Sequence, residues 1–354
     1  MRILLIGKTF ATAAFAQYFT QNPNNIVFST LSGTDAESVD ILPDNIQELK
    51  EFALANEMSL TLLCDKDSIL SPIKEEFEKD RLRVFAPDSK TFKFLNSKIW
   101  AKKIIYKNKI PTPRFQFFEK PQAAIEYVRK NKFPIVIKPD SIGALGARIC
   151  ETFGSAKVAI EEFFDNGVKK ILTEEYIWGK EFSVYTICDG YNPLFLCEIS
   201  KYQNSFAMIG TDFLGEKEKQ KIAKEVILPF FDTLTKENDA YTGILGFNFV
   251  KTKDKIFLIS IVPFFEDIDS QIAINGIKAS WEDIFECTLS NTLFENFSQI
   301  QQNDSHLLSY EFYENGKKTN VFAQAKTFNA ARKILCEEGA DKKEIEEALK
   351  HWKY

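Results

Sequence analysis

The sequence predicts a mixed fold, with a parallel α/β part first and α+β parts after it. Short apolar runs alternate with amphipathic stretches through the first hundred residues, which is typical of a small parallel sheet covered by helices on both faces. Ile110-Pro111-Thr112-Pro113 then forms a stiff extended linker where the chain is expected to change domain. Beyond it, alternating segments between 181 and 200 indicate antiparallel strands. A chain of 354 residues is long enough for two domains or three small ones.

The elements of the first hundred residues follow from this alternation. Each short apolar run predicts a buried strand, and each amphipathic stretch predicts a helix against the sheet. Strands are expected at 2–6, 26–29, 59–64 and 82–85, helices at 11–20, 46–55 and 71–79, and a basic helix at 89–107.

The rest of the chain alternates strands and helices less regularly. Asn315-Gly316 lies between two alternating runs and predicts a hairpin turn. Strands are expected at 114–118, 134–138, 148–152, 170–173, 181–200 (more than one), 243–251 and 255–262, and helices at 121–131, 156–164, 216–236, 267–277, 281–293, 329–338 and 342–350.

Composition excludes several classes of protein. The formal net charge is −5 with both signs mixed along the chain, which argues against a general nucleic-acid binder. No apolar stretch reaches the ~18 residues of a membrane span. Lys8 interrupts the first apolar run, so we expect no signal peptide and a cytoplasmic protein.

The cysteines and histidines narrow the chemistry. The six cysteines form no C-x-x-C pair and are expected to be small buried residues of a reducing cytosol. The two histidines, His306 and His351, both lie near the end of the sequence. The body of the chain therefore lacks a Ser-His-Asp triad, a Cys-His pair and a histidine-ligated zinc site.

Two lysines and an acidic run are the candidate binding residues. Lys138 ends an apolar strand ahead of a loop that contains Gly143 and Gly146, where its ammonium could reach a phosphate. Lys102, on the preceding helix, could meet it there. The run Glu174-Glu175-Tyr176, followed by Gly179 and Glu181, could line the adenine and ribose of a nucleotide. The alternatives are a solvated helix lysine and an acidic pair on an edge strand.

The order and spacing of these residues resemble the ATP-grasp fold and, more narrowly, the phosphoribosylamine–glycine ligase (glycinamide ribonucleotide synthetase) family. The resemblance covers nearly the whole chain and implies three domains. Residues 1–100 would form an N-terminal parallel βα domain, 101–300 a two-lobed ATP-grasp core with a lid subdomain at about 113–180, and 301–354 a shortened C-terminal α+β domain. The segments that carry the likeness are 59–87, which follows the family's strand–helix–strand without a gap, and 97–102, 110–112, 134–138, 174–181, 241–243 and 267–271.

The resemblance also implies an activity. This family phosphorylates the carboxylate of glycine with Mg-ATP, and phosphoribosylamine then attacks the acyl phosphate, in purine biosynthesis. By resemblance, ATP and an amino acid are the small-molecule partners, and neither a catalytic residue nor a protein partner is assigned. Lys102 and Lys138 would bind the phosphates, Glu174 and Tyr176 would contact adenine with Glu175 in the same run, and Glu181 would contact the ribose.

Several family motifs are altered in this sequence. The metal-binding Glu-x-Asn reads Ser260-Ile261-Val262, and the glycine-rich turn that holds the amine's phosphate reads Gly7-Lys8-Thr9-Phe10. The lid reads Ala144-Leu145-Gly146-Ala147, and the substrate loop is reduced to 202–210. Mg²⁺ prefers carboxylates together with substrate phosphates. The candidates to supply them are Glu198, Glu266 and Asp267, with Asp269 nearby; the alternative is that the acids at 266, 267 and 269 cap the following helix.

Two hypotheses therefore stand. The first is an ATP-dependent carboxylate–amine ligase. The second is a catalytically degenerate paralogue that keeps the fold and a weak nucleotide cleft and has a regulatory or partner-binding role. A dinucleotide-dependent dehydrogenase is excluded, because the first turn lacks the G-x-G-x-x-G fingerprint.

Overall fold

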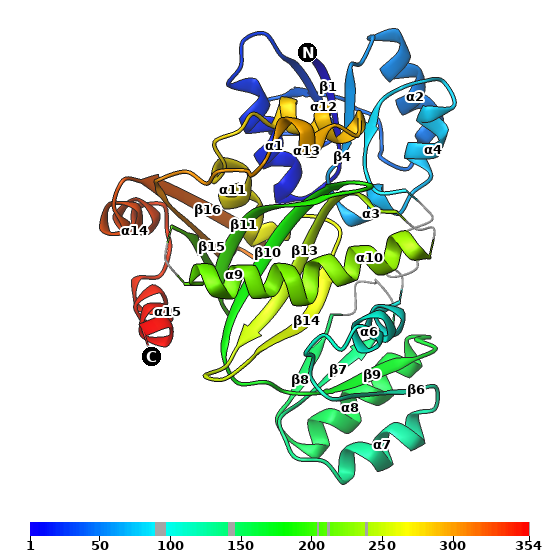
Figure 1. Cartoon of the computed structure of the whole chain (residues 1–354), viewed down its shortest axis with the longest axis vertical. Coiled ribbons are helices and arrows are strands. Elements are labelled where there is room, and N and C mark those ends of the chain that lie inside the picture. Colours follow the sequence, from blue (N-terminus) through cyan, green and yellow to red (C-terminus); the bar gives the residue numbers. More distant parts are fainter. Residues whose placement is uncertain (89–96, 141–145, 204, 211–212, 238–239, 354) are drawn as a thin grey trace.

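Three β-sheets and the helices that cover them make up the computed structural model (Figure 1). The structure describes residues 1–88, 97–140, 146–203, 205–210, 213–237 and 240–353. The first part of the expected basic helix at 89–107, the lid residues Gly143, Ala144 and Leu145 and one residue of the 202–210 loop lie outside the described residues. No helix of the described residues is long and apolar enough to cross a membrane.

The N-terminal sheet is parallel, as the strand–helix alternation predicted. Its order is β3-β2-β1-β4-β5, and its central strand β1 is buried from Ile3 to Ile6 because helices pack on both of its faces. The expected helix at 71–79 is shorter, and the short α3 precedes it. The elements are β1 (Arg2–Ile6), α1 (Phe10–Thr20), β2 (Ile26–Ser29), β3 (Glu37–Ser38), α2 (Ile46–Ala55), β4 (Leu60–Leu63), α3 (Lys66–Ile69), α4 (Ile73–Glu78) and β5 (Val84–Phe85).

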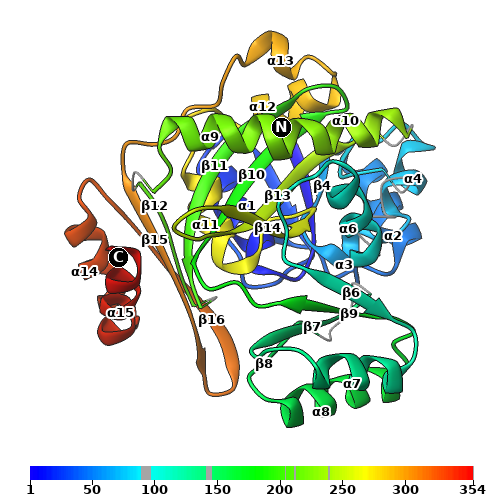
Figure 2. The same cartoon turned by 60° about the horizontal axis from the view of Figure 1, so that its bottom comes forward.

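The second sheet is a four-stranded antiparallel sheet with two helices on its outer face (Figure 2). Its order is β6-β9-β7-β8, and the apolar sides of its helices close a separate small core around Ile137 and Phe163. Helix α6 leads into it from the N-terminal part. The elements are α6 (Lys98–Lys107), β6 (Phe115–Phe118), α7 (Pro121–Arg129), β7 (Ile135–Pro139), β8 (Arg148–Cys150), α8 (Phe153–Asp165) and β9 (Ile171–Glu175).

The third sheet has seven strands in the order β14-β13-β10-β11-β12-β15-β16 and occupies the middle of the molecule. Successive side chains of β10 point to opposite faces, so Val184 packs under the α9–α10 helices while Tyr185 packs towards α1 and α11. The strands are β10 (Lys180–Asp189), β11 (Pro193–Tyr202), β12 (Phe206–Ile209), β13 (Thr242–Lys251), β14 (Ile256–Val262), β15 (His306–Glu314) and β16 (Lys317–Ala325).

The helices around this sheet depart from the sequence prediction at two places. The single helix expected at 216–236 is interrupted by a π-helical turn just before Pro229, which has no N–H to donate to the turn before it. The helix expected at 281–293 is two helices. The elements are α9 (Glu216–Ile222), the π turn (Ala223–Ile227), α10 (Leu228–Lys236), α11 (Asp267–Asn275), α12 (Trp281–Leu289), α13 (Leu293–Asn296), α14 (Phe328–Glu337) and α15 (Lys342–Lys353).

The expected hairpin at Asn315-Gly316 is present as β15 and β16, and it extends the central sheet. β15 pairs with β12 over Ile209↔Leu307 to Phe206↔Tyr310, so the last strands continue the central sheet by hydrogen bonding. Helices α14 and α15 pack against this end of the sheet around Leu335 and Ile345. The three-domain boundaries at 100 and 300 stay a prediction.

Candidate functional site

A cavity of about 450 Å³ lies between the four-stranded sheet and the central sheet. Its volume is in the range of small-molecule sites in proteins. All six residues predicted from the sequence to contact the nucleotide line it: Lys102, Lys138, Glu174, Glu175, Tyr176 and Glu181. They come from α6, β7, the end of β9 and the start of β10, so the fold brings together residues that are far apart in the sequence.

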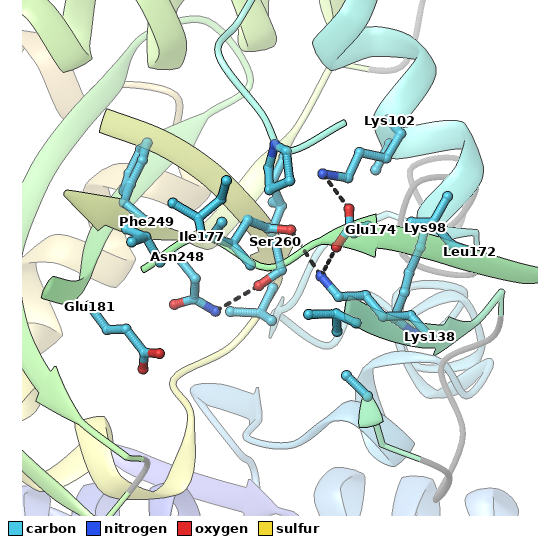
Figure 3. A pocket seen from close by; sticks show the side chains of 18 of the residues that line it. Lys98, Lys102, Lys138, Leu172, Glu174, Ile177, Glu181, Asn248, Phe249 and Ser260 are labelled. Atoms are coloured by element: carbon cyan, nitrogen blue, oxygen red, sulfur yellow. Dashed lines mark hydrogen bonds and ion pairs between the residues drawn. The ribbon is translucent and has the colours of Figure 1, made fainter. Parts of the chain in front are cut away.

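At one end of the cavity, two lysines share one glutamate (Figure 3). The Lys102 ammonium lies 2.6 Å from Glu174 Oε1, and the Lys138 ammonium pairs with Oε2 of the same carboxylate. The pairing of β7 with β9 places Val136 beside Glu174 and so brings Lys138 close to it. The three side chains are at most 8% exposed, and a buried charge is stable only when it is paired in this way.

Burial and pairing act in opposite directions on these groups. Burial lowers the pKa of Lys102 to about 8, although Glu174 opposes the shift. Burial alone would raise the pKa of Glu174, but Lys138 and Lys102 outweigh it and hold that pKa below its usual value. Glu174 is therefore an ionised buried carboxylate between two cations.

A third lysine at this end is Lys98, which sequence reasoning did not single out. It lines the cavity, and its ammonium donates a hydrogen bond to the carbonyl oxygen of Pro139 over 3.0 Å. Burial lowers its pKa to about 8, and the nearby Lys138 acts in the same direction. Three lysines thus surround one buried glutamate, and this end of the cavity carries an excess of positive charge.

The remaining predicted nucleotide contacts lie farther along the cavity. Glu175 is half exposed, and its Oε2 atom lies 3.6 Å from Nε of Arg114. The Tyr176 ring packs edge-on against the exposed ring of Trp178, with 4.8 Å between the ring centroids. Glu181 lies at the opposite end from the lysines (Figure 3), where burial raises its pKa against the opposing charge of Lys201.

Gly179 explains how the chain passes from β9 to β10 at this point. A Cβ atom on Gly179 would lie 2.5 Å from the carbonyl oxygen of Lys251, which is far inside van der Waals contact. Only glycine allows this close approach to β13 without displacing it. Tyr176 and Glu181 therefore lie on either side of the point where the chain passes close to β13.

Between the two ends, two neutral polar side chains face each other across β13 and β14 (Figure 3). The amide of Asn248 donates a hydrogen bond to the Ser260 hydroxyl over 3.0 Å, and its carbonyl oxygen accepts one from Ser183. Val262, two residues beyond Ser260, also lines the cavity and has no polar atom in its side chain. Asn248 was missed at the sequence level; the available signal is a single polar residue within an apolar strand.

Beyond this pair, one lysine is shared by two carboxylates. Lys201 lies 2.6 Å from Glu266 and 2.6 Å from Asp269. Tyr185 donates a hydrogen bond to Asp269 over 2.6 Å, and Asn248 donates one to Glu266 over 3.2 Å. Burial raises the pKa of Asp269 to about 6 even though Lys201 opposes the shift.

The three metal candidates from the sequence are held apart by different lysines. Glu198 pairs with Lys219 at 3.2 Å, away from the residues that line the cavity. Glu266 pairs with Lys201, and Asp267 pairs with Lys318 at 2.9 Å. No group of three or more His, Cys, Asp and Glu side chains in the described part of the chain could hold a metal ion. The donor set therefore does not fit the Mg²⁺ that the resemblance implies, because Glu266, which shares Asn248 as a hydrogen-bond donor with Ser260, already pairs with the Lys201 ammonium.

A second cavity of about 330 Å³ adjoins the first. The two share Lys201, Phe264 and Glu266, and the second extends to Thr9 and Lys66 of the N-terminal part. In the turn before α1, the Lys8 N–H donates to the Asp65 carboxylate over 2.6 Å. This backbone donor, in the turn where the family holds the amine's phosphate, is thus occupied by a carboxylate of the protein itself.

The chain is similar to proteins of known family. The family described as phosphoribosylglycinamide synthetase, ATP-grasp (A) domain, matches residues 96–270. Phosphoribosylamine–glycine ligases from Caldanaerobacter subterraneus subsp. tengcongensis and Clostridium acetobutylicum are 28% and 26% identical to this chain, each over 83% of it and 76% of the relative.

Two solved structures show the fold. The phosphoribosylamine–glycine ligase of Thermotoga maritima superposes with a TM-score of 0.68 at 15% identity, over 95% of this chain and 96% of that one. The biotin carboxylase domain of the Hydrogenobacter thermophilus 2-oxoglutarate carboxylase, in a complex with MgADP, superposes with a TM-score of 0.66 at 13% identity, over 88% and 74%. The chain is therefore similar to phosphoribosylamine–glycine ligases, and its residues 96–270 match the ATP-grasp domain of that family.

Proposed function

We propose that this protein is an ATP-dependent carboxylate–amine ligase of the phosphoribosylamine–glycine ligase type, with a role in purine biosynthesis. The observation that carries the proposal is the cavity between the two sheets, in which three lysines at one end and Glu181 at the other frame a space of nucleotide size. The similarity to ligases over 83% of the chain supports the same class of reaction. ATP, glycine and phosphoribosylamine are the substrates that this class uses.

The lysine end suits the phosphates of ATP. Lys98, Lys102 and Lys138 outnumber the one buried carboxylate there, so an anionic ligand relieves their mutual repulsion. Phosphoryl transfer depends mainly on positioning and on neutralising charge on the transferred group. In this assignment Glu174 holds the Lys102 and Lys138 ammonium groups in place. Glu174 lies near the end of β9, which would face the adenine. Glu181 would accept hydrogen bonds from the ribose.

The second cavity suits the other substrates, because it opens beside the cleft and shares Lys201 and Glu266 with it. A carboxylate bound there would attack the γ-phosphorus of ATP. A new O–P bond forms, the bond to the β,γ-bridging oxygen breaks, and ADP leaves with that electron pair. The amine nitrogen then attacks the carbonyl carbon of the acyl phosphate, the C–O bond to phosphate breaks, and the amine loses a proton to solvent. Ammonium groups along the cleft stabilise the negative charge of both steps.

Release of ADP tests this proposal. We expect ADP release that requires both glycine and phosphoribosylamine, and a loss of about 100-fold or more in Lys138→Met. Lys157→Met, on the outer helix α8, removes the same charge from a half-exposed position and is expected to behave like the unmodified protein. A screen of other small amino acids and amines extends the test. Absence of ADP release with every pair rejects the ligase.

The donor set around Ser260 favours a second candidate, a degenerate paralogue that binds a nucleotide without turnover. Asn248 and Ser260 are neutral, and Glu266 is held by Lys201. In that case ATP binds, but no ADP is released with any carboxylate and amine. Binding and turnover measured on the same preparation separate the two candidates.

A further inference from the structure

The ammonium group of Lys201 contacts two carboxylates in the cleft, those of Glu266 and Asp269. Lys201 lies on β11 directly opposite Glu181 of β10, and it lines both cavities. Its side chain is only 7% exposed, and two carboxylate oxygens lie 2.6 Å from its ammonium. This contact between one buried cation and two carboxylates leaves Glu266 and Asp269 already neutralised in part.

Strands β13 and β14, over the residues that the structure describes, carry no carboxylate, and the acid that faces Lys201 from β10 is Glu181. Asn248 and Ser260 face each other as an amide and a hydroxyl, and both donors of the Asn248 amide are directed to protein oxygens, those of Ser260 and Glu266. A divalent cation at this place would have to displace the Lys201 ammonium from Glu266. It would also have to replace a hydrogen bond that Asn248 makes to the same carboxylate.

The positive charge for a nucleotide's phosphates is available at the other end. Lys102 and Lys138 share the buried carboxylate of Glu174 there, and Lys98 lines the same end of the cavity. Ammonium groups neutralise phosphate oxygens directly through charge-assisted hydrogen bonds. Ammonium groups can therefore neutralise both kinds of anion that a metal ion would contact in the cleft. Lys98, Lys102 and Lys138 would neutralise the phosphates, and Lys201 neutralises the carboxylates.

We propose that Lys201 occupies the carboxylates of the cleft in place of a divalent cation, so that this chain binds nucleotide without needing Mg²⁺. The proposal rests on the proposed function only in that a nucleotide occupies the cleft. It concerns how charge is balanced there and holds for a ligase and for a protein without turnover.

Nucleotide titrations in the presence of Mg²⁺ and of EDTA test the inference. For the unmodified protein we expect ADP and ATP dissociation constants that differ by less than about threefold between the two conditions. Tightening by about tenfold or more on addition of Mg²⁺ overturns the inference and leaves the proposed function standing. No nucleotide binding in either condition overturns both.

A gain of metal dependence gives a second, independent readout. Ser260→Asp places a carboxylate beside Asn248 and Glu266 within the cavity, and we expect it to bind ATP about tenfold more tightly with Mg²⁺ than with EDTA. Thr252→Asp is the matched control, because it adds the same charge in the turn of the same hairpin, where Thr252 already accepts hydrogen bonds from backbone N–H groups. It is expected to remain independent of Mg²⁺.

Lys201→Met tests the lysine itself. Removing the ammonium frees Glu266 and Asp269, and the variant is expected to acquire dependence on Mg²⁺, both for nucleotide binding and for thermal stability. If Lys201→Met does not fold, Ser260→Asp decides the question alone. A Ser260→Asp protein that folds and binds nucleotide equally well with and without Mg²⁺ contradicts the inference.

Discussion

The two ends of the cleft have opposite compositions. At one end two lysines, Lys102 and Lys138, share the single carboxylate of Glu174. At the other, the single ammonium of Lys201 is shared by Glu266 and Asp269. The Glu174 cluster is buried throughout, whereas in the Lys201 cluster the Glu266 side chain is 36% exposed. The first cluster has an excess of cation and the second an excess of acid. The first is suited to receive an anion, while in the second both carboxylates already contact one internal ammonium.

The largest expected effect comes from removing the shared acid at the lysine end. Glu174→Ala leaves two buried ammonium groups without their common partner, and we expect the free energy of unfolding to fall by about 3–5 kcal/mol. Urea denaturation measures it. Glu175→Ala, one residue along and half exposed, should change stability by no more than about 0.5 kcal/mol. Equal losses in the two variants would show that the Glu174 cluster does not stabilise the fold.

The next effect concerns the nucleotide. Lys102→Met removes one of the phosphate-facing cations while Glu174 keeps Lys138 as its partner, so the fold is expected to survive. We expect the ATP dissociation constant to rise by about 10- to 100-fold, since charge-assisted hydrogen bonds are worth roughly 1.5–3 kcal/mol each. Calorimetric titration provides the measurement, with Lys157→Met as the control. An unchanged ATP affinity in Lys102→Met would remove the lysine end from the nucleotide site.

The two ends should also respond to pH in opposite directions. Burial raises the pKa of Asp269 to about 6, above its value in an unfolded chain, so folded Asp269 holds its proton more tightly. Its contribution to stability is therefore present at low pH and is lost as pH rises through about 4 to 6. Glu174, whose pKa is lowered by the two lysines despite its burial, contributes above the unfolded pKa, and this contribution is lost as the pH falls.

Urea denaturation of two variants across this pH range separates these effects. The stability advantage of the unmodified protein over Asp269→Asn should shrink as the pH rises from about 4 to about 6. Its advantage over Glu174→Gln should be constant above about pH 4.5 and shrink as the pH falls below that value. Parallel pH profiles for the two variants would contradict the contrast between the clusters.

The smallest expected effect lies at the rim of the cleft. Trp178 is 72% exposed and packs edge-on against Tyr176. Trp178→Phe keeps an aromatic ring at this place, so ATP affinity should change by less than about threefold. The change in tryptophan emission on adding ATP should be smaller in Trp178→Phe than in the unmodified protein. An emission change of full size in the variant would place the nucleotide away from the Tyr176 side of the cavity.

Much of the fold could be predicted from local patterns. Alternation of strand and helix gave the parallel N-terminal sheet, and Asn315-Gly316 gave the β15–β16 hairpin. The pairing of β12 with β15 could not be predicted in the same way, because it joins segments about a hundred residues apart, both of which pack against α11. The interruption near Pro229 depends on one missing N–H and does not alter the apolar periodicity of the helix.

Part of the candidate site could also be predicted from local sequence patterns, and part could not. Lys138 and Glu174 could be found because each lies where an apolar strand ends, and paired strands bring such positions together. Their sharing of one ion-pair cluster depends on side-chain directions that a sequence does not specify. Lys201 directly follows the segment 181–200 in which strands are expected, and nothing in the sequence sets it apart. Its importance comes from Asp269, which reaches it from a helix more than sixty residues later.

The most direct test of the contrast between the two clusters is the structure of this protein with ADP bound. The account predicts phosphate oxygens within about 3 Å of the Lys102 and Lys138 ammonium groups, with Lys201 still paired to Glu266 and Asp269. Phosphates bound beside Lys201, with a metal ion between them and Glu266, would contradict it.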